Sequence, residues 1–171
     1  QTCALPISMS VAVASAIETP TKLIWNATAS APVGFYTVEP ADRIEVPELV
    51  AVMPPEPLAA FMVARGYIGR GVPLLKRVVG LPGQRVCRAG RTITVDGIEM
   101  GEALERDRIG RELPAWQGCR VIAPGEIFLM NRDVRDSLDG RYFGPLRASA
   151  VLGRAIPILT RQTPDAPLTW R

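Results

Sequence analysis

At the centre of the chain stand Leu74-Leu75-Lys76-Arg77-Val78-Val79 and then Gly80-Leu81-Pro82-Gly83. The apolar run predicts a buried strand, and the glycine–proline segment predicts the tight turn that ends it. Lys76 stands inside this run, although Lys22 and Lys76 are the only lysines among 20 basic residues and histidine is absent. Burial can deprotonate a lysine but not an arginine, so Lys76 is a candidate general base. Without histidine, a serine hydrolase would need such a base instead of a Ser-His-Asp triad.

Short strands are predicted on both sides of this segment. The 16 prolines and 15 glycines suit strands joined by many turns better than a helical bundle. One helix is expected at Pro57–Arg65, ended by Gly66. The runs that predict strands are Lys22–Trp25, Phe35–Val38, Leu49–Met53, Leu74–Val79, Arg85–Arg88, Thr92–Val95, Cys119–Ile122, Ile127–Met130 and Val151–Leu159. The fold class is therefore mostly β with one short helix, and the polar segment 102–114 is expected to be a surface excursion.

A length of 171 residues fits one domain, which we assign to residues 20–160, with a loose tail at 161–171. Residues 1–7 look like the translation of a common sequencing-adapter oligonucleotide, so we interpret 1–8 as a cloning or assembly artefact. The small apolar residues that follow are fewer than the roughly twenty that a membrane-spanning helix needs. We interpret 9–19 as what is left of an N-terminal signal anchor, and a frayed tail or an edge strand is the alternative.

The composition narrows the class of function. The net charge is +3 and the charges are scattered among acids, which indicates a solvated surface and no nucleic-acid partner. The chain lacks histidine and a CxxC pair, and no glycine-rich segment fits a phosphate loop, so we expect no metal and no cofactor. Cys87 and Cys119 are either two buried thiols or, in an oxidising compartment, a disulfide. The sequence predicts no particular oligomeric state.

A loop of small residues follows the first predicted strand, Asn26-Ala27-Thr28-Ala29-Ser30-Ala31-Pro32-Val33-Gly34. Small neighbours allow a substrate backbone to approach Ser30 closely, and Pro32 restricts the turn. Both features suit an exposed nucleophile beside a backbone N–H that faces an oxyanion. The alternative is an ordinary turn.

A charged segment follows the strand predicted at Ile127–Met130. It contains Asn131-Arg132-Asp133-Val134-Arg135-Asp136-Ser137-Leu138-Asp139-Gly140-Arg141-Tyr142-Phe143-Gly144. Asp139 and Arg141 stand two residues apart, so an extended segment would place them on one face. Taken alone, the pattern is also that of a salt-bridged surface turn.

In order and residue type, these three segments resemble the type I signal peptidase family of Ser/Lys proteases. The segments beginning at Lys76 and at Ser137 match the family closely, and the resemblance spans about Leu23 to Leu159. The serine segment differs, because Ala31 follows Ser30 where the usual cellular enzyme has methionine. This form is similar to the conjugative-transfer branch, the TraF-type peptidases of plasmid mating systems.

The resemblance implies a role for each matching residue. Ser30 matches the nucleophile and Lys76 the general base. Thr28 matches a hydroxyl that supports the oxyanion, and Ser137 matches the serine that orients the lysine. Asp139 and Arg141 match a pair that buttresses the site. The implied fold is a signal-peptidase-like antiparallel β-sheet or barrel.

The resemblance also implies a setting and a substrate. Family members bind a pre-protein as an extended strand at the membrane lipid surface. Their catalytic domain lies on the periplasmic side of the bacterial inner membrane, which favours a Cys87–Cys119 disulfide. For the conjugative branch the implied substrate is a pilin precursor, whose ends some members join into a ring.

Three alternatives stay beside this interpretation. A general type I signal peptidase of secreted proteins would share the chemistry. A LexA-type self-cleaving regulator would share the dyad, but it needs an upstream DNA-binding region and an internal Ala-Gly scissile bond. A basic β-barrel that binds nucleic acid would need aromatic residues interleaved with basic ones, and this chain does not have that pattern.

Overall fold

The computed structural model describes residues 22–163 and 165–171. The segments interpreted as an adapter artefact and as the remainder of an anchor lie outside this range. The strands are β1 (Lys22–Asn26), β2 (Val33–Glu39), β3 (Leu49–Val52), β4 (Leu74–Gly80), β5 (Arg85–Ala89), β6 (Thr92–Val95), β7 (Ile98–Glu102), β8 (Gly118–Val121), β9 (Glu126–Leu129), β10 (Leu146–Arg147), β11 (Val151–Arg161) and β12 (Thr169–Trp170). The helices are α2 (Glu56–Ala64), the four-residue α3 (Gly140–Phe143) and a 3₁₀ turn at Ala148–Ala150.

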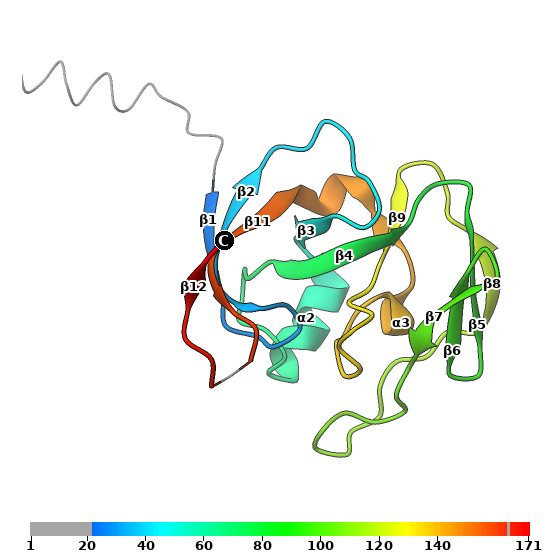
Figure 1. Ribbon diagram of the computed structural model, residues 1–171. Helices are drawn as coiled ribbons and strands as arrows, with labels where there is room; N and C mark the ends of the chain where they lie inside the picture. Colours follow the sequence, from blue (N-terminus) through cyan, green and yellow to red (C-terminus); the bar gives the residue numbers. More distant parts are fainter. Residues whose placement is uncertain (1–21, 164) are drawn as a thin grey trace, which may run out of the picture.

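The strands form two antiparallel sheets, visible on the left and the right of Figure 1. The larger has the order β1-β2-β11-β3-β4-β9-β10, with β12 added to β11, and the smaller has the order β7-β6-β5-β8. The predicted fold class, mostly β and antiparallel, is confirmed. Sequence-distant strands are neighbours, since β11 lies between β2 and β3.

The predicted central strand occupies the centre of the structure. In β4, Leu74 to Lys76 and Val78 to Gly80 are buried on both faces and only Arg77 is exposed. Leu75, Val78 and Val79 each belong to a different hydrophobic cluster of the core. Because β4 contributes to all three clusters, the backbone that carries Lys76 is held from every side.

The one predicted helix is confirmed within a residue, and Gly66 follows it with φ +70°. The Gly66 N–H donates to the Val63 carbonyl and the Tyr67 N–H to the Met62 carbonyl. This pair of bonds is a Schellman ending, which needs the left-handed conformation that glycine adopts without strain.

Three expectations about secondary structure were wrong. There is a second short helix, α3, because the Asp139 side chain accepts a hydrogen bond from the Arg141 N–H and so starts a helical turn. Strand β7 was not predicted; it pairs with β6, and only its last residue, Glu102, belongs to the expected surface excursion. The expected loose tail contains β12, which pairs with β11.

The two cysteines of the described residues lie on adjacent strands of the smaller sheet. Cys87 of β5 and Cys119 of β8 are direct partners in the register. Their sulfur atoms are 2.11 Å apart, a disulfide that links two strands already paired by their backbones.

Candidate active site

Ser30 stands in the loop between β1 and β2, and Asn26 organises this loop. Asn26 is buried, and its Nδ2 donates to the carbonyls of Thr28 (2.9 Å), Ala31 (3.1 Å) and Pro32 (3.1 Å). The Tyr36 hydroxyl also donates to the Pro32 carbonyl, at 2.6 Å. Sequence reasoning assigned no role to Asn26, although the loop conformation depends on it.

The Ser30 hydroxyl contacts the hydroxyl of Thr28. Thr28 Oγ1 lies 2.9 Å from Asn26 Oδ1 and 3.2 Å from Ser30 Oγ. The amide oxygen of Asn26 only accepts, so the single proton of Thr28 goes to it, and Ser30 donates to Thr28. In this arrangement Thr28 is an acceptor for Ser30. Support of an oxyanion by Thr28 would need its hydroxyl to rotate.

Lys76 is buried on β4, with 3% of its surface exposed. Its Nζ donates to Ser137 Oγ at 2.8 Å. Burial lowers the pKa of Lys76 from 10.5 to about 8, while the carboxylate of Asp139 raises it in part and the charge of Arg141 lowers it. An appreciable fraction of Lys76 is therefore neutral near physiological pH.

Asp139 and Arg141 form a buried ion pair, 2.8 Å between Asp139 Oδ2 and Arg141 Nη2. Their exposed fractions are 0% and 1%, so the surface-turn interpretation is wrong, and the segment between them is helical instead of extended. The remaining donors of Arg141 bind four backbone carbonyls, those of Glu102, Asn131, Val134 and Arg135. The pair thereby fixes the segment that carries Ser137.

The smaller sheet and its loops hold α3 in place. Arg88, a buried residue of β5, donates to the Arg141 carbonyl at 2.7 Å. Trp116 Nε1 donates to the Gly140 carbonyl at 3.1 Å, and the Tyr142 hydroxyl accepts from the Leu104 N–H at 2.9 Å. The second sheet therefore positions the ion pair from outside the main sheet.

Asn131 joins the serine loop to the lysine strand. Its Nδ2 donates to the carbonyls of Ser30 and Leu75, and its Oδ1 accepts from the Arg77 N–H at 3.0 Å. These bonds flank Lys76 on both sides along β4. No role for Asn131 was predicted, because the partners of its side chain are 54 to 101 residues away in the chain.

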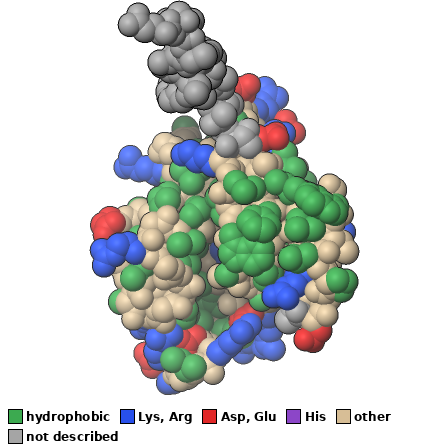
Figure 2. Space-filling model, turned by 90° about the vertical axis from the view of Figure 1, so that its left-hand side faces the viewer, with side chains coloured by type: hydrophobic (Ala, Val, Ile, Leu, Met, Phe, Trp, Pro, Cys, Tyr) green, Lys and Arg blue, Asp and Glu red, His purple; other side chains and the backbone are tan. Residues whose placement is uncertain are grey.

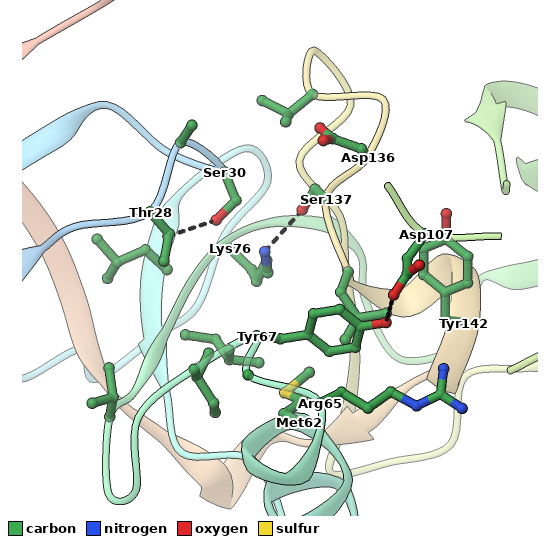
Figure 3. Close-up of a pocket in the computed structure, with 18 of the residues that line it drawn as sticks. Thr28, Ser30, Met62, Arg65, Tyr67, Lys76, Asp107, Asp136, Ser137 and Tyr142 are labelled. Atoms are coloured by element: carbon green, nitrogen blue, oxygen red, sulfur yellow. Dashed lines mark hydrogen bonds between the residues drawn. The ribbon is translucent and has the colours of Figure 1, made fainter. Parts of the chain in front are cut away.

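Thr28, Ser30, Lys76 and Ser137 line one cavity of about 380 Å³, which we call the main cavity. Figure 3 shows Ser30 and Lys76 facing the same space, with Ser137 beside the lysine. Ser30 also lines a second cavity of about 230 Å³, together with Arg77 and Asn131. The described residues contain no cluster of three or more side chains suited to a metal ion. The arrangement offers a hydroxyl nucleophile and a partly neutral amine in one cavity, the elements of acyl transfer.

Comparison with known proteins agrees with this geometry. The family model "Signal peptidase, peptidase S26" matches residues 2–160. The Conjugal transfer protein TraF of Agrobacterium fabrum is 39% identical over 146 residues, covering 79% of this chain and 81% of that protein. The Plasmid transfer protein TraF of Escherichia coli is 33% identical over 146 residues, with the same coverage.

A solved structure, a signal peptidase I from Enterococcus faecalis, aligns with 66% of this chain and 98% of its own. Its sequence identity is 22% and its TM-score 0.38, too low to carry an argument. The family match and the TraF relatives identify the family without this structure. They confirm the resemblance to the type I signal peptidase family and the resemblance to its conjugative-transfer branch. This chain therefore belongs to the signal peptidase family, peptidase S26.

Proposed function

We propose that this chain is a membrane-associated serine endopeptidase with a Ser30–Lys76 dyad that removes a leader sequence from a pilin precursor during conjugative plasmid transfer. The observation that carries the proposal is the buried Lys76 with a pKa of about 8 in the cavity that Ser30 lines. The relatives named for conjugal and plasmid transfer support the substrate class.

The chemistry follows from the two groups. Ser30 Oγ attacks the scissile carbonyl carbon, and neutral Lys76 Nζ takes the hydroxyl proton. The Ser30 N–H stabilises the oxyanion of the tetrahedral intermediate. When the C–N bond breaks, the Lys76 ammonium returns the proton to the leaving amine. Water then attacks the acyl ester and gives a proton to Lys76. When the ester C–O bond breaks, Lys76 returns this proton to Ser30 Oγ and the acid is released.

The peptide is proposed to bind as an extended strand at the edge of the larger sheet. Among the described strands, β1 pairs with β2 alone, so no other described strand pairs with the backbone of its outer edge. Ile24 and Asn26 of this strand line the main cavity, and Ser30 lies between the two cavities. A strand added along β1 would thus lead its side chains toward Ser30.

A row of large apolar side chains supports contact with the membrane. Trp25, Phe35, Leu159 and Trp170 are successive register partners across β1, β2, β11 and β12. The indole groups are 46% and 76% exposed, and Figure 2 shows hydrophobic side chains gathered on one face of the molecule. Aromatic rings of this kind suit the lipid interface. No helix of the described part of the chain has the length and apolar character to cross a membrane. We propose the periplasmic side of the bacterial inner membrane as the location.

The test is cleavage of a membrane-embedded pilin precursor from the same plasmid, followed by mass spectrometry. Wild type is expected to cut after a small residue, while Ser30→Ala and Lys76→Arg leave the precursor intact. The product mass separates a linear product from a ring. Cleavage of a general secretory precursor instead of the pilin would move the chain to the general signal peptidases. Activity of Lys76→Arg near wild type would exclude the lysine base.

A further inference from the structure

We propose that the part of the main cavity around Met62 and Tyr67, which Figure 3 shows away from Ser30, binds one large apolar side chain of the substrate. We call this part the distal pocket and define it by Met62, Tyr67, Val72, Leu104 and Ile109. The proposal rests on the proposed function and deepens it, because it specifies a feature of the peptide that the same cavity accepts.

The distal pocket is formed by two segments that lie outside the strands of both sheets. α2 and the chain that follows it supply Met62, Tyr67 and Val72, and the 104–113 segment supplies Leu104 and Ile109. Met62 is buried, while Val72 and Ile109 are 40% and 73% exposed at the rim. Exposed apolar side chains beside a cavity mark a surface where an apolar ligand gains by burial.

Polar groups that line the same cavity are occupied with one another. The Tyr67 hydroxyl and Arg111 Nε both donate to Asp107 Oδ2 at 2.7 Å, as Figure 3 shows for the tyrosine. Arg111 Nη2 donates to the Arg65 carbonyl, and Arg65 Nη1 donates to the Glu112 carbonyl at 2.6 Å. The two segments are thereby joined. Their polar groups already have partners within the protein, so we assign the contact with a ligand to the apolar side chains of the distal pocket.

The wall is also tied to the catalytic end of the cavity. Arg108 forms an ion pair with Asp136, the residue before Ser137. Leu104 is held through its N–H by the Tyr142 hydroxyl of α3. These contacts connect the wall of the pocket to the catalytic end of the cavity, and a wall held in place lowers the entropy lost when a ligand side chain enters.

The size of the cavity decides what fits. The resemblance to the signal peptidase family implies shallow pockets that accept small side chains, typically alanine, just before the cut. The main cavity of this chain measures about 380 Å³. A cavity of roughly 150 Å³ already holds a benzene ring. A substrate with only small side chains would leave the distal pocket empty, whereas a phenylalanine or leucine would fill it. We expect such a residue to strengthen binding about ten-fold or more over alanine.

The test measures binding, so that it does not depend on turnover. Fluorescent alanine-based peptides carry a single phenylalanine at each position in turn, and the all-alanine peptide is the reference. Binding to Ser30→Ala protein is followed by fluorescence anisotropy. We expect one position at which phenylalanine tightens binding about ten-fold relative to the all-alanine peptide. This ratio should fall to near one in Ser30→Ala/Val72→Trp, whose indole fills the pocket from its rim.

Val121→Trp is the matched control, since Val121 is an exposed valine of β8 outside the main cavity. It should keep the phenylalanine preference. Equal binding of all peptides, or a preference that survives Val72→Trp, would overturn the proposal. Cleavage by wild type is scored separately. A peptidase without size preference fails this inference alone, and a size preference without cleavage fails the proposed function alone.

Discussion

Two of the buried basic side chains, Arg141 and Lys76, lie in opposite electrostatic environments. Arg141 and Asp139 form what we call the arginine centre. Arg141 faces the carboxylate of Asp139 and donates to four backbone carbonyls. In the lysine centre, Lys76 Nζ has the Ser137 hydroxyl as its hydrogen-bond partner. Burial alone would lower the pKa of Arg141, but the hydrogen bonds and charge of Asp139 outweigh it and raise that pKa. The pKa of Lys76 falls to about 8.

The difference separates structure from chemistry. A buried cation with a full set of partners stays charged and holds the chain around it. A buried cation with a single neutral partner is driven toward its uncharged form. The arginine centre thus stabilises the 131–137 segment, and the lysine centre contains the amine that we propose as the base. Each of the following changes removes a group from one of the two centres.

The largest expected effect comes from Lys76→Met, which keeps the shape of the side chain and removes the amine. The rate of precursor cleavage should fall about 10³-fold or more, because the proposed general base for the Ser30 hydroxyl is removed. Steady-state kinetics with a precursor that the wild type cleaves measures this loss. Lys22→Met, the same change at the exposed lysine of β1, should behave as wild type. Equal losses in both variants would refute the assignment.

Arg141→Met breaks the arginine centre and leaves the Asp139 carboxylate buried without its partner. The free energy of unfolding should fall by about 3–5 kcal/mol, measured by urea denaturation near neutral pH. Arg147→Met, at an exposed arginine of β10, is the control and should change stability little. If Arg141→Met were as stable as this control, the buried pair would have no structural role.

The pH dependence of stability distinguishes the two centres further. The folded pKa of Lys76 is about 8 against 10.5 for an ordinary lysine, so the unfolded chain binds more protons between these values. Wild type should therefore gain stability as the pH rises from about 8 to 10.5, by about 3 kcal/mol relative to Lys76→Met. Parallel urea titrations of the two proteins measure the difference. A difference in stability that stays constant across this pH window would show that the pKa of Lys76 is not lowered in the folded protein.

Ser137→Ala should have the smallest effect of the set. It removes the acceptor that stabilises the Lys76 ammonium, so the pKa of Lys76 should fall further. The acidic limb of the pH–rate profile should move to lower pH, and the rate should drop about 10- to 100-fold because the amine is less well oriented. Ser149→Ala, at an exposed serine, is the matched control. An unmoved limb would leave Ser137 with a packing role only.

The sequence predicted the lysine centre better than the arginine centre. Lys76 was visible because it interrupts an apolar strand, and the strand confirms its burial. The α3 turn was missed because it depends on one side-chain cap at Asp139 and is only four residues long. Strand β7 was missed because it is mostly exposed and has no alternating apolar pattern. Both elements are local, since the cap of α3 is Asp139 and β7 pairs with the neighbouring β6, but they are too short or too exposed to show hydrophobic periodicity.

Asn131 and the distal pocket show a different limit. Asn131 binds residues on two other segments, so its importance appears only once β4 and the serine loop are side by side. The wall of the distal pocket likewise joins residues more than 40 positions apart, as in Arg65 and Glu112. The residue types at Ser30, Lys76 and Ser137 could be read from the sequence, but the contacts that position them could not.

The central claim is that burial makes Lys76 a base near neutral pH, and NMR of the lysine side chains tests it directly. The chain has only two lysines, so ¹³C-lysine labelling gives two signals, assigned with Lys22→Arg. Following the Cε shift of Lys76 against pH, in Ser30→Ala protein to prevent self-digestion, should give a midpoint at about 8. A midpoint near 10.5, the ordinary value for lysine, would contradict the account.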